Sequence, residues 1–177
     1  MNTITLKQFH DKIDELIEQS YITSPPKKKL KTMGKSAGIR YGKQAEVAAI
    51  HFLKQHPSVQ KTREQVRFRP VGGLSCIDVV LDMKNGETVY VPVAKDIWRA
   101  TAQCDRLETL YAKFEGKLIE KYNVCYLMAS DYKVRLKRTF KKGTIKEVLI
   151  NEELKELADA NIVHNIETLW EHLHTFK

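Results

Sequence analysis

Residues 75–108 read SCIDVVLDMKNGETVYVPVAKDIWRATAQCDRLE, and this stretch decides the fold. It predicts two strands joined by a tight turn and followed by a helix. The turn is Asn85-Gly86, because both residues tolerate the positive φ that a two-residue hairpin loop requires. With that loop, Asp78 lies directly opposite Val93, and the two faces of the hairpin are fixed.

The two faces of this hairpin differ in composition. The first is wholly apolar and is expected to pack on a core; it carries Ile77, Val79, Leu81, Tyr90, Pro92 and Ala94. The second places Lys95 one diagonal step from Asp78, within side-chain reach. Lys95 lies opposite Cys76, and the setting of this second face is mostly valine: Val80, Val89, Val91 and Val93.

An aspartate near the end of one strand, with a lysine on the next, resembles the catalytic hairpin of the PD-(D/E)XK nuclease superfamily. In that pattern an acidic residue stands two positions before the lysine, where this chain has Val93. One subgroup of type II restriction endonucleases moves this carboxylate to the following helix. The spacing of Lys95 and Glu108, with twelve residues between them, resembles that subgroup. The resemblance covers roughly residues 34–130.

The resemblance implies a Mg²⁺ site built from carboxylates. Asp78 would bind the metal, and Glu108 would replace the acid that is absent at position 93. Glu46, on a helix before the hairpin, would complete a second metal position or orient a ligating water. Lys95 would contact the scissile phosphate and lower the pKa of the attacking water. The implied catalytic residues are Asp78, Lys95, Glu108 and Glu46.

Both glutamates also have a purely structural interpretation. Glu46 lies one to two turns after the expected start of a helix over residues 37–56, where a negative charge favours the helix dipole. Glu108 could be a solvated glutamate on the helix expected from about 99 to 121.

The chain has 177 residues and a formal net charge of +8, which allows nucleic acid as a partner. Basic residues gather in three segments, residues 27–31, 62–69 and 131–142, and the last also holds Tyr132 and Phe140, which could stack on bases. Each segment could instead be a solvated surface. The residues expected to contact DNA are Arg40, Lys43, Arg99, Gln103, Lys133, Arg135, Lys137, Arg138, Lys141 and Lys142.

Length and periodicity favour a single domain over residues 1–177. We expect an N-terminal packing or dimer helix (1–19), a basic connector (20–36), a catalytic core (37–130), and a basic segment with closing helices (131–177). The apolar run of residues 123–130 predicts a central strand. The expected fold class is α/β (α+β), a central mixed β-sheet flanked by helices, with the αβββαβ order of the restriction-endonuclease-like core.

Other chemistry finds little support in the sequence. The three cysteines are expected to be buried free thiols. His172 and His174 are two apart on a helix and point to different sides, and His164 has no cysteine or acidic neighbour at ligand spacing. No signal peptide, membrane-spanning run or organic-cofactor motif is present, so a cytoplasmic protein is expected.

The expected function is a Mg²⁺-dependent, site-specific deoxyribonuclease that cuts double-stranded DNA as a homodimer, similar to the restriction enzyme of a restriction–modification system. Two alternatives stay open. Val93 favours a non-catalytic DNA-binding or partner-binding module on a decayed nuclease core. A repair or recombination nuclease that recognises DNA structure instead of sequence is the other.

Overall fold

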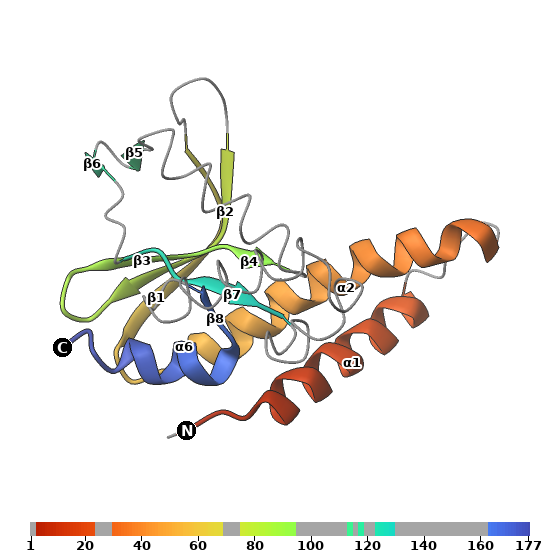
Figure 1. Cartoon of the computed structure of the whole chain (residues 1–177), viewed down its shortest axis with the longest axis horizontal. Coiled ribbons are helices and arrows are strands. Elements are labelled where there is room, and N and C mark those ends of the chain that lie inside the picture. Colours follow the sequence, from red (N-terminus) through yellow and green to blue (C-terminus); the bar gives the residue numbers. More distant parts are fainter. Residues whose placement is uncertain are drawn as a thin grey trace, which may run out of the picture.

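The computed structural model describes residues 3–23, 30–68, 75–94, 113–114, 117–118, 123–129 and 163–177. Figure 1 shows the arrangement of their helices and strands. In chain order these are α1 (Leu6–Thr23), α2 (Leu30–Leu53), β1 (Val59–Phe68), β2 (Ser75–Met83), β3 (Thr88–Val91), β4 (Val93–Ala94), β5 (Lys113–Phe114), β6 (Lys117–Leu118), β7 (Tyr126–Met128), β8 (Val163–His164) and α6 (Ile166–Leu173).

The strands form an antiparallel and a parallel group. Strands β1, β2 and β3 are antiparallel neighbours, whereas β4, β7 and β8 pair in parallel. The backbone N–H of Cys125 donates to the Tyr90 carbonyl, and that of Leu127 donates to the Pro92 carbonyl. The segment of β7 therefore runs along both β3 and β4 and links the two groups. The fold is α+β with a mixed set of strands, as the sequence predicted.

Helix α2 packs on the hairpin through a stripe of small and apolar side chains. Ala45, Ala48 and Ala49 are fully buried, and alanine lets a helix approach a sheet closely. Helices α1 and α2 lie side by side (Figure 1), and α1 contributes Phe9 and Ile13 to the same core. From α6 the core receives Ile166, Leu169, Trp170 and Leu173.

A backbone N–H in the first turn of α1 finds its hydrogen-bond acceptor in α6, near the other end of the chain. The backbone N–H of Leu6 donates to Oε1 of Glu167 at 2.7 Å. This N–H has no partner within its own helix, and a carboxylate there also favours the positive end of the helix dipole. The contact joins α1 directly to α6.

The β2–β3 hairpin corrects the expected register. The N–H of Gly86 donates to the Met83 carbonyl, Met83 and Glu87 close the strand pair, and Gly86 has φ 91°. This is a three-residue loop in which a left-handed glycine follows the turn. The Asn85 side chain favours it by accepting the N–H of Glu87 at 2.9 Å.

The one-residue shift exchanges the faces of the second strand. Val79 pairs with Val91 and Leu81 pairs with Val89, so both partner valines belong to the core beneath α2. The prediction that these valines share a face with Asp78, and that Asp78 lies opposite Val93, was wrong. The expected single second strand is also interrupted at Pro92, whose nitrogen has no proton to donate to a ladder.

Other boundaries also differ from expectation. Helix α1 continues to Thr23 and α2 already begins at Leu30, so the expected connector of residues 20–36 is much shorter. Lys113–Phe114 and Lys117–Leu118 pair as strands inside the expected helix of residues 99–121, where Gly116 has a low helix propensity. Residues 130–162, which include the basic segment of residues 131–142 and part of the region expected to hold the closing helices, lie outside the described residues. Among the described helices, none combines the length and the apolarity needed to cross a bilayer.

Candidate active site

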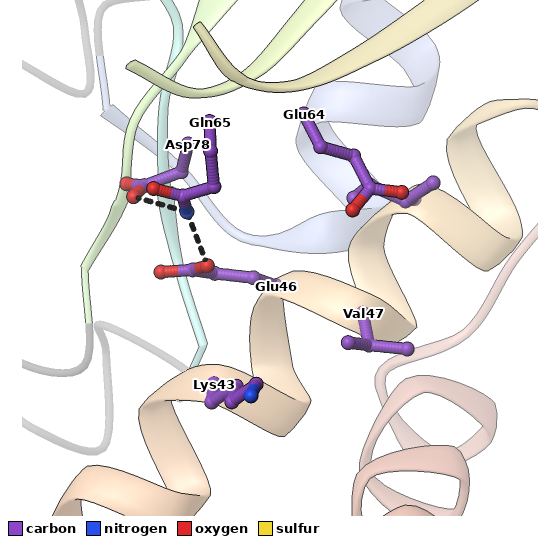
Figure 2. Close-up of a pocket in the computed structure, with 7 residues that line it drawn as sticks. Lys43, Glu46, Val47, Glu64, Gln65 and Asp78 are labelled. Carbon is purple, nitrogen blue, oxygen red and sulfur yellow. Dashed lines mark hydrogen bonds between the residues drawn. The ribbon is translucent and has the colours of Figure 1, made fainter. Parts of the chain in front are cut away.

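A hollow of about 280 Å³ lies between α2 and the β1–β2 strand pair. Figure 2 shows Gln65 and Asp78 pointing toward Glu46 across this hollow. Its walls come from α2, β1 and β2. They combine three carboxylates with a lysine, a glutamine and two apolar side chains. The lining residues are Lys43, Glu46, Val47, Ile50, Glu64, Gln65 and Asp78.

Glu46 is placed by the helical period of α2. The buried residues Ala45 and Ala49 face the core, so Glu46 lies at the flank of the helix, beside the sheet. Lys43 and Ile50, three residues before and four residues after it, share its side of the helix. Because α2 begins at Leu30, Glu46 lies more than four turns inside the helix. The interpretation of Glu46 as a charge at the helix N-terminus was therefore wrong.

Gln65 connects the two carboxylates. The pairs Glu64–Val79 and Val66–Ile77 place it opposite Asp78 in the β1–β2 register. Its Nε2 donates to Oε2 of Glu46 at 2.7 Å and reaches Oδ1 of Asp78 at 3.4 Å. Gln65 also has φ 48°, a left-handed conformation that is uncommon for a residue other than glycine. Strained backbone of this kind clusters at functional sites.

Asp78 is held on both of its oxygens. Oδ2 accepts the backbone N–H of Val93 at 2.8 Å, while Oδ1 faces Gln65. Val93 thus contributes its backbone to this site, and its side chain packs against the hydrophobic core. The residue that replaces the acid of the resembled motif therefore orients the aspartate through its amide.

Burial, first of all, and the negative charges of Asp78 and Glu64 together raise the pKa of Glu46 to about 7. The hydrogen bond from Gln65 opposes this rise. Near neutral pH, the Glu46 carboxyl is therefore poised between its protonated and its ionised form.

The donor set of the hollow fits a divalent cation. The carboxylates of Glu46, Asp78 and Glu64 and the amide oxygen of Gln65 are hard oxygen donors, which Mg²⁺ prefers. A bound cation would offset both the cost of burying the Glu46 charge and its repulsion from Asp78, the two largest causes of the raised pKa.

The structure brings together three of the residues expected at the site: Asp78, Glu46 and Lys43 line one hollow. Arg40 lies one turn before Lys43 in α2. Lys95 follows Ala94 and lies outside the described residues, as do Glu108 and the remaining residues expected to contact DNA, namely Arg99, Gln103, Lys133, Arg135, Lys137, Arg138, Lys141 and Lys142.

Gln65 and Glu64 were missed by the sequence reasoning. Gln65 stands among arginines in TREQVRFR and carries no motif of its own. Only the register of β1 on β2 brings it opposite Asp78, and that register depends on the connection between the strands. Of the same basic segment, Arg63 forms an ion pair with Asp82 at 2.8 Å and is largely covered, so it is engaged within the fold.

A second group of polar side chains gathers away from this hollow. Cys125, His164 and His172 each place one ligand atom within 4.8 Å of the other two. The sequence shows no cysteine at ligand spacing from His164, and it is the parallel pairing of β7 with β8 that brings Cys125 close to it.

Comparisons with protein-family models, with curated proteins and with solved structures found no match for this chain.

Proposed function

We propose that this chain is a Mg²⁺-dependent endonuclease that hydrolyses phosphodiester bonds in double-stranded DNA, in the manner of type II restriction enzymes. The observation that carries the proposal is the pair of carboxylates, Glu46 from α2 and Asp78 from β2, joined through Gln65 at the hollow. They lie 32 residues apart in the chain, and the resemblance to the nuclease motif assigns Asp78 to the metal and Glu46 to a second metal position or to a ligating water.

In this proposal the described residues hold and orient the cation. Asp78 and Glu46 supply its oxygen ligands, and Glu64 adds negative charge at the same hollow. Gln65 and the amide of Val93 fix the direction of the carboxylates, as partners behind metal ligands commonly do. When bound, the cation supplies positive charge against a phosphate oxygen and lowers the pKa of a water.

Two further roles are proposed for residues beyond the described ranges. Lys95, directly after β4 in the chain, contacts the scissile phosphate. Glu108 supplies the carboxylate that the resembled motif carries at the position of Val93. The net charge of +8 favours a polyanionic substrate, and a homodimer places one site on each DNA strand.

The test is cleavage of a long unmethylated DNA with Mg²⁺ by the wild type and by Asp78→Asn and Glu46→Gln. We expect discrete fragments from the wild type and a loss of at least about 100-fold in each variant, because a metal ligand is removed. Asp14→Asn, which alters an exposed carboxylate of α1, is the matched control and should cleave normally. Normal cleavage by Asp78→Asn would refute the proposed site.

The second candidate is a DNA-binding module that does not cleave. It is favoured by the contact of Val93, which offers Asp78 only a backbone N–H where the motif has a carboxylate. Such a protein would shift DNA on a gel, with steep salt dependence, and leave it intact in Mg²⁺. A smear of fragments without discrete bands would instead indicate a nuclease that does not select a sequence.

A further inference from the structure

Three side chains with nitrogen or sulfur donors converge where β7, β8 and α6 meet. Cys125 comes directly before β7, His164 is the last residue of β8, and His172 lies in α6. One donor atom from each lies within 4.8 Å of the others. Cys125 and His164 are buried, with 0% and 2% of their surfaces exposed. None of the three lines the hollow that holds Glu46.

His172 has a donor atom without a partner. Its Nε2 is buried and makes no hydrogen bond within the part of the chain that the structure describes. Buried polar atoms nearly always have a hydrogen-bond partner, and a bound ion is one reason why such an atom lacks one. The His172 ring stacks on the His164 ring with centroids 5.0 Å apart, and the Phe176 ring meets it edge-on at 5.5 Å. These rings leave the unsatisfied nitrogen in a largely apolar setting.

We propose that Cys125, His164 and His172 form a Zn²⁺ site that fastens α6 to the parallel strands. Imidazole nitrogen and thiolate sulfur are the ligands that zinc takes in proteins, whereas Mg²⁺ prefers oxygen. With bonds of about 2.0–2.3 Å, a tetrahedral zinc ion holds its ligand atoms roughly 3.3–3.7 Å apart. Since no pair of donor atoms is more than 4.8 Å apart, the pairs have to close by at most about 1.5 Å, which small side-chain rotations achieve.

Burial acts in opposite ways on the two kinds of ligand: it favours the neutral histidine and opposes ionisation of the cysteine. Burial lowers the pKa of His172, so its ring is neutral and can offer a lone pair. Burial also raises the pKa of the Cys125 thiol to about 12, so zinc would have to displace the thiol proton on binding. Three protein ligands leave a fourth tetrahedral position for another ligand.

The site is tested on the purified full-length chain, first stripped with a chelator and then titrated with Co²⁺ as a spectroscopic substitute for zinc. We expect one equivalent of Co²⁺ to give a thiolate-to-cobalt charge-transfer band and the intense visible bands of tetrahedral cobalt. Zn²⁺ should abolish both signals. Zn²⁺ at roughly a hundredfold above its Kd should also raise Tm by about 5–10 °C.

Matched variants locate the metal. His172→Ala should lose the tetrahedral bands and the zinc-dependent rise in Tm, and Cys125→Ser should lose the charge-transfer band. His174→Ala alters the same end of α6 but none of the three donors, so it should behave like the wild type. The double variant Glu46→Gln, Asp78→Asn should also keep the bands, because the two carboxylates that it removes line the hollow beside α2 and not the cysteine–histidine group.

The outcomes against the proposal are equally distinct. A wild type without a charge-transfer band, or bands that persist in both His172→Ala and Cys125→Ser, would overturn it. If Cys125→Ser fails to fold, His172→Ala decides alone, since the His172 side chain is only partly buried and can be removed with less disturbance of the core. A Tm that does not respond to Zn²⁺ in the wild type would also contradict the site.

Discussion

Asp78 accepts the backbone N–H of Val93 at 2.8 Å. Position 93 is where the resembled nuclease motif carries its second acid, and here the position serves the aspartate through an amide. The Val93 side chain meanwhile packs against the core formed with α2. The absence of a carboxylate at this position therefore follows from the direction in which its side chain lies.

Val93→Glu should not create a better metal site. The new carboxylate would enter partly buried, apolar surroundings, so we expect the free energy of unfolding to fall by about 2–3 kcal/mol and DNA cleavage not to rise. Urea denaturation and a cleavage assay check both. Val93→Thr is the control and should lower the free energy of unfolding by less than Val93→Glu does. A stable Val93→Glu variant with increased cleavage would show that the side chain reaches the hollow.

Gln65→Leu should raise the pKa of Glu46 above about 7, because the mutation removes the hydrogen bond that opposes the effect of burial and of Asp78. If the hollow binds metal, cleavage should fall about 10- to 100-fold through loss of carboxylate orientation. Carbon-detected NMR of the glutamate side chain gives the pKa directly. An unchanged Glu46 titration would mean that the Gln65 contact does not persist in solution.

The raised pKa of Glu46 makes stability depend on pH in a defined direction. Between pH 4.5 and about 7 the folded carboxyl keeps a proton that the unfolded chain has lost. The free energy of unfolding should therefore fall as pH rises through this window. Because Glu46 is only half-buried and solvent screens its charge, we expect the free energy of unfolding to change by about 1 kcal/mol across this window. Glu46→Gln should remove this slope in denaturation curves recorded between pH 4 and 8. A slope unchanged in the variant would assign the effect to other groups.

His56 should give a slope of opposite sign. Its Nδ1 accepts the N–H of Ser58 and its Nε2 donates to the Trp170 carbonyl, both at 3.0 Å, and burial lowers its pKa to about 4. Between pH 4 and 6.5 the unfolded chain binds the extra proton, so stability falls as pH decreases. His56→Gln should remove this slope. It should also lower the free energy of unfolding at pH 7 by about 1–3 kcal/mol, because the glutamine amide cannot bond the Trp170 carbonyl and the Ser58 N–H with the geometry of the imidazole ring. Identical acid unfolding of the variant and the wild type would contradict this role.

Phe9→Ala tests whether α1 belongs to the core of its own chain. Phe9 is fully buried, and its ring lies 6.4 Å from that of Phe52 in α2. We expect a loss of about 3–5 kcal/mol in the free energy of unfolding, independent of protein concentration. The exposed Ile22 at the end of α1 provides the control, since Ile22→Ala should cost little. If stability depends on concentration and Phe9→Ala abolishes that dependence, α1 is a dimer helix as well.

The elements that the sequence predicted well are those set by local pattern. The apolar run of residues 123–130 predicted a central strand, and the structure has β7 there, fully buried. The start of α2 was missed because Gly34, Gly38 and Gly42 weaken the local helix signal, while packing on the sheet stabilises the rest of the helix.

The site was harder to predict because it depends on contacts between distant segments. One residue more in the hairpin loop, favoured by the side chain of Asn85, changed every partner of β3. Gln65 reached Asp78 through a strand register, and Cys125 met His164 through a parallel pairing. None of these contacts leaves a fixed spacing in the sequence.

The hydrogen bond between Leu6 and Glu167 spans 161 residues. Because α6 also supplies Trp170 and Leu173 to the core that holds Phe9, the packing of α1 cannot be completed until α6 has been synthesised. A contact between residues so far apart in the chain forms slowly. During translation, α1 can already pack on α2, but the apolar surface that meets α6 stays uncovered, and this interval is when the nascent chain is most exposed to chaperones and to aggregation.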